Sequence, residues 1–265
     1  MHYEEYWGLS QAPFDNVPDP QFYFPSTKHE EGLHRLLYGV GAGKGAVMLT
    51  GEIGCGKTLL SRALVRHLQS DRYDLAVMAN PSLKMADFMK EILYQFGITP
   101  TRSKLDSLHA LNDRFLENLQ KGKKTVLIVD EAQAITDIDV FEELRLLLNF
   151  QLNDLFLLTV VLLGQPELKV KVETLKQLAQ RIEIRYHLAP FGTGEVRAYV
   201  DFRMRTAGGK GAAFTEDAIV AIHEVTGGIP RKINTVCDLA LLIGFLGRCQ
   251  EVNRATVDKA YRETQ

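Results

Sequence analysis

Short apolar runs alternate with amphipathic stretches along the first two thirds of the chain. Five runs are typical of strands buried in a parallel sheet: residues 45–50, 74–80, 126–129, a run within 155–168 that ends at 164–165, and 182–188. Four stretches between them place apolar side chains at helical spacing: residues 59–68, 84–96, 104–120 and 141–150. Because strands that alternate with helices form a parallel sheet covered on both faces, we expect an α/β domain.

The strand pattern stops at about Pro190, and the rest of the chain predicts helices alone. Four helices are expected, over residues 193–208, 215–228, 229–247 and 253–264. Thr193, Thr215 and Asn253 are residue types that cap helix N-termini, and glycines follow three of these helices. We therefore predict three parts: an N-terminal segment (1–44) that packs on the core, an α/β core (45–189) and a small helical lid (190–265).

The stretch GEIGCGKT, Gly51 to Thr58, has the G-x-x-x-x-G-K-T spacing of a phosphate-binding loop. It joins a predicted strand to a predicted helix, so that backbone N–H groups and the helix N-terminus can meet an anion. We expect Lys57 to reach the β- and γ-phosphates and the Thr58 hydroxyl to ligate Mg²⁺. The predicted nucleotide-binding residues are Gly51, Glu52, Ile53, Gly54, Cys55, Gly56, Lys57, Thr58 and Leu59.

A second motif is the apolar strand of VLIVDE, which ends in Asp130 and Glu131. Parallel strands meet ligands at their carboxyl ends, and two adjacent carboxylates can divide the work of hydrolysis. We expect Asp130 to hold Mg²⁺ through water and Glu131 to polarise the attacking water. The two motifs together predict an ATPase that uses ATP and Mg²⁺; the alternative is a buried strand with a solvated acidic end.

The composition of the chain and the motifs that it lacks exclude several classes of phosphate-loop protein. The chain has 265 residues, 46% of them hydrophobic, and a net charge of −2, which gives no general attraction to nucleic acid. No run approaches 18 apolar residues, the N-terminus lacks the form of a signal peptide, and the three cysteines lack metal-type spacing, so we expect a cytoplasmic protein. The sequence contains no N-K-x-D, D-x-x-G or L-S-G-G-Q motif, which argues against a GTPase and a cassette transporter.

Segments around these motifs resemble one family from end to end. They are residues 6–40, LTGEIGCGKT, VLIVDEAQ, EELRLLLNF, LLGQPEL, LAQRIEIRYHL and GGIPRKINTVCDLALL. The chain resembles the AAA+ ATPases of general secretion pathway protein A type, which have relatives in pilus, exosortase-locus and transposition systems. The resemblance implies an AAA+ P-loop core with a five-stranded parallel sheet and a small all-α lid. It also implies an ATP-dependent homo-oligomer, a ring or another oligomer, that helps to assemble an envelope machine.

Larger secretion members add a membrane helix and a periplasmic peptidoglycan-binding domain, and we expect neither here. The resemblance therefore leaves two possibilities: the chain is the cytoplasmic portion alone, or a partner protein brings it to the inner face of the cell membrane. The second hypothesis is a DNA-binding AAA+ regulator of the transposition type. Its phosphate contacts would have to come from Lys121–Lys124 or Arg203–Arg205, the compact basic clusters, and each is more typical of a solvated loop or helix face.

The resemblance also assigns roles to single residues. Gln165 matches sensor 1, a polar side chain between the attacking water and the γ-phosphate. Arg181 matches the arginine that one subunit offers to its neighbour's γ-phosphate, with Arg185 as the alternative, and Arg231 matches sensor 2 on the lid. A surface ion pair is the competing interpretation for each arginine. In the family the N-terminal segment contributes to the adenine pocket, and residues 22–29 are nearest to that role.

Overall fold

A computed structural model describes residues 2–16, 19–68, 71–101, 103–209 and 213–265. Internal contacts divide the chain into two units. The core unit contains residues 28–51 and 57–188, and the helical unit contains residues 1–27, 52–56 and 189–265. The core was predicted to end at residue 189, and the two units divide between residues 188 and 189. The predicted boundary at residue 44 lies inside the core unit, because only the first 27 residues group with the helices.

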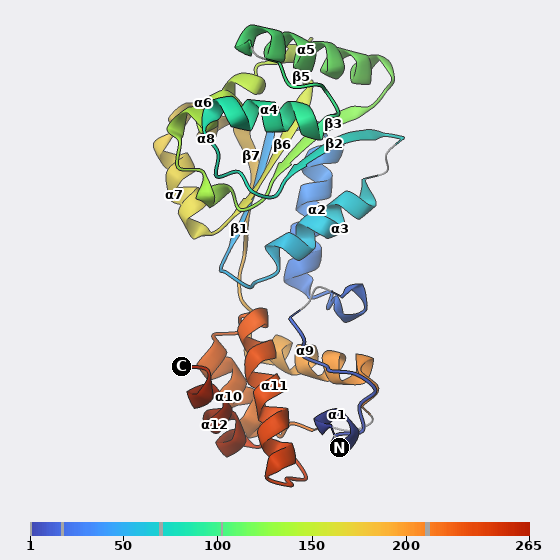
Figure 1. The fold of residues 1–265 in the computed structure, drawn as a ribbon, viewed down its shortest axis with the longest axis vertical. Coiled ribbons are helices and arrows are strands. Elements are labelled where there is room, and N and C mark those ends of the chain that lie inside the picture. Colours follow the sequence, from blue (N-terminus) through green and yellow to red (C-terminus); the bar gives the residue numbers. More distant parts are fainter. Residues whose placement is uncertain (1, 17–18, 69–70, 102, 210–212) are drawn as a thin grey trace. The chain divides into compact units, whose positions relative to one another are not determined.

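The core unit is built on one parallel sheet (Figure 1). Its strands are β1 (Ala46–Gly51), β2 (Tyr73–Met78), β3 (Lys124–Val129), β6 (Leu158–Gly164) and β7 (Ile182–Leu188). They lie in the order β2-β3-β6-β1-β7, and all four pairings are parallel. β1 and β6 are buried along their whole length, as central strands covered on both faces should be. The five-stranded parallel sheet predicted from the apolar runs is confirmed.

Helices cover both faces of this sheet (Figure 1). The helices of the core unit are α2 (Thr27–Gly41), α3 (Lys57–His67), α4 (Met85–Gln95), α5 (Lys104–Gln120), α6 (Ile138–Leu147), α7 (Pro166–Thr174) and α8 (Lys176–Arg181). One apolar cluster packs α4 to α8 against alternate strand residues such as Met48, Leu127 and Leu162. The other face receives α2 and α3: a side chain at Gly39 would meet Val47, and one at Gly32 would meet Leu60.

Several elements of the core unit were not predicted. They are α2, α7, α8 and a small hairpin of β4 (Gln151–Leu152) and β5 (Leu155–Phe156). The hairpin turns at Asn153 and Asp154, whose φ angles of 50° and 62° are those of a type I′ turn. Two-residue strands are too short to show any alternation of apolar and polar positions, so the pattern could not reveal them.

The helical unit contains the four predicted helices: α9 (Thr193–Thr206), α10 (Glu216–Thr226), α11 (Pro230–Leu246) and α12 (Arg254–Glu263). Thr215 and Asn253 cap their helices as predicted, each accepting a bond from a backbone N–H three residues on. The prediction for Thr193 was wrong. Gly192 is the N-cap of α9, and the Glu195 carboxylate accepts the Gly192 N–H at 2.9 Å, which supplies the capping bond from inside the helix.

The N-terminal residues pack on the helices of the same unit. They include α1 (Tyr3–Tyr6) and a 3₁₀ turn, η1 (Pro20–Phe22). Trp7 donates its indole N–H to the Leu241 carbonyl at 2.9 Å, and the Ser10 N–H donates to the Ala207 carbonyl at 2.8 Å. Phe14 belongs to the apolar core of this unit. Among the described residues, every helix is too short or too polar to cross a lipid bilayer.

Arg203 corrects one expectation from sequence. We expected residues 203–205 to form a solvated basic helix face, but the Arg203 side chain is only 6% exposed. Its guanidinium donates to the carbonyls of Pro13 at 2.5 Å and Asp15 at 2.9 Å and to the Tyr199 hydroxyl at 3.0 Å. The Phe22 ring also lies 4.6 Å from its central carbon. These acceptors replace water around the charge, so Arg203 fastens the N-terminal residues to α9.

Candidate nucleotide site

The predicted phosphate-binding loop connects β1 to α3. Gly54 and Gly56 have φ angles of 85° and 100°, in the region that residues with a side chain rarely adopt. Residues 52–56 group with the helical unit, where the Arg231 N–H donates to the Gly54 carbonyl at 3.3 Å. A Cβ at Gly54 would lie 2.7 Å from the Cβ of Arg231. Both the backbone conformation and this close approach therefore require glycine at position 54.

The side chains of this loop differ in exposure. Lys57, the first residue of α3, is only 5% exposed, and its amine donates to the Gly51 carbonyl at 2.8 Å. Cys55 is buried, Leu59 is half-buried, and Glu52, Ile53 and Thr58 are exposed. A buried ammonium beside the start of a helix is the arrangement that binds phosphate oxygens, since the charge and the helix N-terminus act on the same side.

Asp130 follows the last residue of β3 and is 6% exposed. Burial raises the pKa of its carboxyl, while hydrogen bonds from the Glu131 N–H and the Thr58 hydroxyl oppose that rise. The charge of Glu131 raises the same pKa further, and the ammonium of Lys57 lowers it. The hydrogen bond between the Thr58 hydroxyl and the Asp130 carboxyl joins the two residues that were predicted as magnesium ligands.

Thr58 and Asp130 supply oxygen ligands, which are the kind that Mg²⁺ prefers. Among the described residues, no three His, Cys, Asp or Glu side chains gather into a further metal cluster. A site with few protein ligands fits Mg²⁺ bound to a nucleotide, because this ion keeps several waters and takes its other ligands from phosphates.

Glu131 has an unusual backbone conformation and two amide neighbours. Its φ and ψ of 51° and 35° are left-handed, which is uncommon for a residue with a side chain. The Gln133 amide donates to its carboxylate at 2.5 Å, and the Gln165 amide donates to the same oxygen at 3.5 Å. Gln165 follows β6, the strand next to β3, so the ends of two adjacent strands bring these side chains together.

Gln133 is a contact residue that the sequence analysis missed. It stands two positions after Glu131 in VDEAQ, and its type and place at a strand end were visible in the sequence. What the pattern could not show is that its side chain turns back to Glu131 and also accepts the Gln165 N–H at 3.0 Å.

Arg181 and Arg185 lie elsewhere in the core unit. Arg181 ends α8, donates to the Asn149 side chain at 3.1 Å and lies 5.8 Å from the centre of the Phe156 ring. Arg185, on the edge strand β7, donates to the Ala179 carbonyl at 2.7 Å. Within the described part of the chain, neither arginine bonds to Asp130 or Glu131. The choice between them as the finger stays a prediction.

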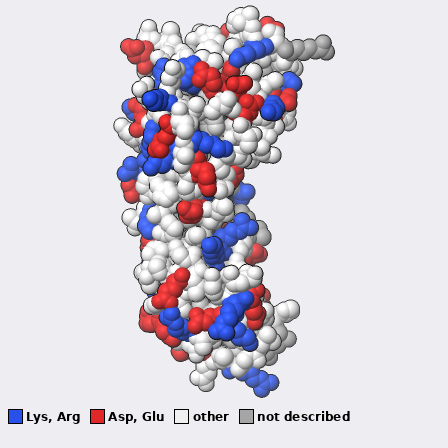
Figure 2. All heavy atoms as spheres, turned by 90° about the vertical axis from the view of Figure 1, so that its left-hand side faces the viewer, with Lys and Arg blue, Asp and Glu red and all other residues white. Residues whose placement is uncertain are grey.

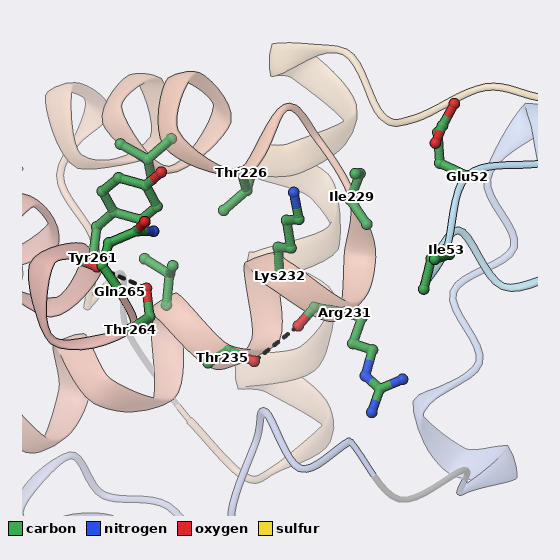
Figure 3. Close-up of a pocket in the computed structure, with 12 residues that line it drawn as sticks. Glu52, Ile53, Thr226, Ile229, Arg231, Lys232, Thr235, Tyr261, Thr264 and Gln265 are labelled. Carbon is green, nitrogen blue, oxygen red and sulfur yellow. Dashed lines mark hydrogen bonds between the residues drawn. The ribbon is translucent and has the colours of Figure 1, made fainter.

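Arg231 borders a pocket of about 580 Å³ in the helical unit (Figure 3). Arg231 and Lys232 come from the first turn of α11, and the Thr235 hydroxyl donates to the Arg231 carbonyl at 3.1 Å. Glu52 and Ile53 of the phosphate-binding loop line the same pocket. Arg231 therefore combines an exposed side chain with a backbone bond to the loop, and its role as sensor 2 stays a prediction.

Comparisons with known proteins show what this chain is similar to. A family model described as an AAA domain matches residues 41–171. General secretion pathway protein A of Aeromonas hydrophila is 42% identical over 247 residues, which cover 92% of this chain and 45% of that protein. The chain thus spans less than half of the length of this relative.

Solved structures share the fold at low identity. The Drosophila ORC bound to DNA matches with a TM-score of 0.70 and 20% identity, over 95% of this chain and 64% of that chain. The Aeropyrum pernix ORC2 protein in its ADPNP-ADP complexes matches with a TM-score of 0.65 and 17% identity, over 97% of this chain and 73% of that chain. The chain therefore belongs to the AAA+ ATPases, and it resembles general secretion pathway protein A over most of its own length.

Proposed function

We propose that this chain hydrolyses ATP with Mg²⁺ at the carboxyl ends of β3 and β6, and that it works as a homo-oligomer that ATP assembles. The observation that carries the proposal is the grouping of Glu131 with Gln165, next to an Asp130 carboxylate bonded to Thr58. A metal-binding carboxylate, a second carboxylate and an amide within one site are the parts that phosphoryl transfer to water requires.

Each residue then has a chemical task. Lys57 places a positive charge against the β- and γ-phosphates, and Thr58 and Asp130 hold the metal. When bound, Mg²⁺ neutralises charge that builds up on the phosphate oxygens. Glu131 accepts the proton of the attacking water, and the Gln165 amide fixes that water against the γ-phosphate. Arg231 contacts the nucleotide of its own subunit from the lid.

The proposed finger, Arg181, acts on the nucleotide of a neighbouring subunit. Its guanidinium donates to the Asn149 amide oxygen and lies over the Phe156 ring, and among the described residues it forms no ion pair with a carboxylate. A planar guanidinium suits phosphate oxygens, since it donates two parallel bonds. This arrangement makes activity depend on assembly, because no single subunit contains the whole site.

The proposed biological role is the ATP-driven assembly of a secretion or pilus-type envelope machine from the cytoplasmic side, through an envelope partner protein. The similarity to general secretion pathway protein A supports it. DNA binding is less well supported. On the described face drawn in Figure 2, basic and acidic side chains are interspersed without a large area of one sign. Arg203 is buried, and Lys121 pairs with Glu117.

The proposal is tested with the purified chain. Phosphate release from ATP should need Mg²⁺, and Lys57→Ala should abolish nucleotide binding because it removes the charge that faces the phosphates. Light scattering should show a larger mass with a non-hydrolysable ATP analogue than without it. An unchanged mass over a wide range of protein concentration would contradict assembly. Retardation of plasmid DNA in the presence of the analogue would favour the transposition-type regulator instead.

A further inference from the structure

The Gln133 side chain spans the gap between Glu131 and the start of α7. Its Nε2 donates to Glu131 Oε2 at 2.5 Å, and its Oε1 accepts the Gln165 N–H at 3.0 Å. Both ends of one amide are therefore used, one on the carboxylate after β3 and one on the backbone after β6. These two strands are neighbours in the sheet.

Only one orientation of this amide satisfies both partners. An ionised carboxylate only accepts hydrogen bonds and a backbone N–H only donates, so the amide nitrogen must face Glu131 and the oxygen must face Gln165. A turn of the amide by 180° would place two acceptors together and two donors together. The orientation of Gln133 is thus fixed by its surroundings.

Glu131 stands on a left-handed backbone, a conformation that persists in a residue with a side chain only where neighbouring groups hold it. The Gln133 bond is shorter than the 3.5 Å bond from the Gln165 side chain, and hydrogen bonds to a charged group are the stronger kind. Gln133 is therefore the principal restraint on the carboxylate.

The surrounding residues hold Gln133 in turn. Lys171, on α7, donates its ammonium to the carbonyls of Gln133 at 2.5 Å and Ile135 at 2.8 Å. Gly164, the last residue of β6, leaves room for the amide, since a Cβ there would lie 2.8 Å from Gln133 Oε1. The segment after β3 and the junction of β6 with α7 thus both pack against the Gln133 side chain.

We propose that Gln133 is a positioning residue for hydrolysis: it aims the Glu131 carboxylate at the attacking water and ties that aim to the backbone of Gln165. The inference rests on the proposed function, in which Glu131 activates water. A displacement of the β6–α7 junction would then also displace the Glu131 carboxylate, because the Gln133 amide bonds to both. Gln133 contacts no substrate and acts only through the carboxylate.

Two substitutions separate the two ends of the amide. Gln133→Glu keeps the shape and an acceptor for the Gln165 N–H, but it loses the donor to Glu131 and places two carboxylates side by side. Gln133→Met keeps the length and removes both bonds without adding charge. Both variants should lower kcat by about 10- to 100-fold, the size of effect expected when a reacting group is misplaced by about 1 Å. KM for ATP should stay within about twofold, since no contact to the nucleotide is lost.

A double-mutant cycle distinguishes positioning from a general structural role. In a Glu131→Gln background, neither change at Gln133 should lower kcat further, because the group that Gln133 positions is already gone. Gln120→Glu, an added charge on an exposed residue at the end of α5, is the matched control and should leave kcat unchanged. Thermal unfolding and ATP affinity of each variant establish that it folds.

The outcomes separate this inference from the proposed function. If Glu131→Gln keeps normal turnover, the proposed function fails and the positioning role fails with it. If Glu131→Gln is inactive while both Gln133 variants keep kcat within about twofold of the wild type, Gln133 does not position Glu131. An equal further loss of kcat in the Glu131→Gln background would also overturn the inference, since the effect would then not pass through the carboxylate. If Gln133→Glu does not fold, Gln133→Met decides alone.

Discussion

Two polar clusters in this molecule differ in the sign of their charge and in their surroundings. The Arg203 cluster, in the helical unit, joins Arg203 to Tyr199 and to the carbonyls of Pro13 and Asp15. The Tyr199 hydroxyl donates in turn to Asn234 at 2.8 Å. The charge of Arg203 is buried, and its guanidinium nitrogens already donate to acceptors within the protein.

The Glu131 cluster, in the core unit, consists of Asp130, Glu131, Gln133 and Gln165. Three of its side chains are half-buried, its central carboxylate stands on a left-handed backbone, and its Asp130 carboxyl has a pKa raised by burial. A left-handed backbone and a buried carboxyl are costs to stability that proteins accept at functional sites. A polar cluster whose charge is buried among acceptors holds a fold together, whereas a half-buried cluster on a left-handed backbone retains capacity for a reaction.

The largest expected effect tests whether the Glu131 cluster is complete within one subunit. Arg181→Ala leaves Lys57, Asp130 and Glu131 intact, so ATP should still bind while hydrolysis slows by about 10³–10⁵-fold, the contribution of an arginine finger. Lys57→Ala is the reverse, since it cannot hold ATP but still presents Arg181.

Mixing these two inactive proteins should restore activity at interfaces that combine an intact site with an intact finger. Phosphate release is measured against mixing ratio at fixed total protein. Arg231→Ala should show no such rescue by Lys57→Ala, because that arginine serves its own subunit. A flat curve for Arg181→Ala, with hetero-assembly verified, would assign the finger to Arg185.

The second effect tests whether the Glu131 cluster is chemical rather than structural. Glu131→Gln should slow turnover by about 10²–10⁴-fold, since it removes the group that takes the proton from water. ATP affinity should remain, because Lys57 and the loop are untouched, and stability should change little. Glu167→Gln, an exposed carboxylate on α7, is the control for lost charge. Steady-state kinetics measure the turnover of each variant, and nucleotide titration measures its ATP affinity. An equal loss of ATP affinity in Glu131→Gln and Lys57→Ala would contradict the assigned roles.

The third effect tests the opposite cluster. Arg203→Met should destabilise the helical unit by roughly 1–3 kcal/mol, because it removes the charged donor from the buried Pro13 carbonyl and from the buried Tyr199 hydroxyl. Hydrogen exchange at the Ser10 N–H, which bonds to the Ala207 carbonyl, reports the loosening of the N-terminal residues. Arg205→Met, an exposed neighbour, should change nothing. Unchanged exchange in Arg203→Met would show that the cluster does not hold this segment.

The sequence predicted what depends on local pattern. The five sheet strands and the four helices after residue 190 have clear apolar periods, and the phosphate-binding loop has fixed spacing, so all of them could be read from neighbouring residues. The fate of Arg203 could not be predicted, because its acceptors Pro13 and Asp15 lie 190 and 188 positions away. Gln165, which donates its N–H to the Gln133 side chain, is 32 positions distant. A pattern shows which face of an element is apolar, but not which distant polar groups will meet there.

The smallest effect concerns Asp130, the buried member of the Glu131 cluster. Burial raises the pKa of this carboxyl above its ordinary value of 3.8, so the folded protein binds a proton more tightly than the unfolded chain does. Stability that comes from this proton is present below pH 3.8 and is lost as the pH rises through the folded-state pKa.

Asp130→Asn has no proton to lose, so it should be more stable than the wild type at pH 7, and the difference should vanish as the pH falls toward 3.8. Urea unfolding of both proteins at several pH values measures this, with the exposed Asp113→Asn as the control. The same variant should lose hydrolysis, because a neutral amide lacks the negative charge with which Asp130 would hold the hydrated Mg²⁺. A variant that is less stable at pH 7 would show that the Asp130 charge supports the fold, and the contrast between the two clusters would then not extend to this residue.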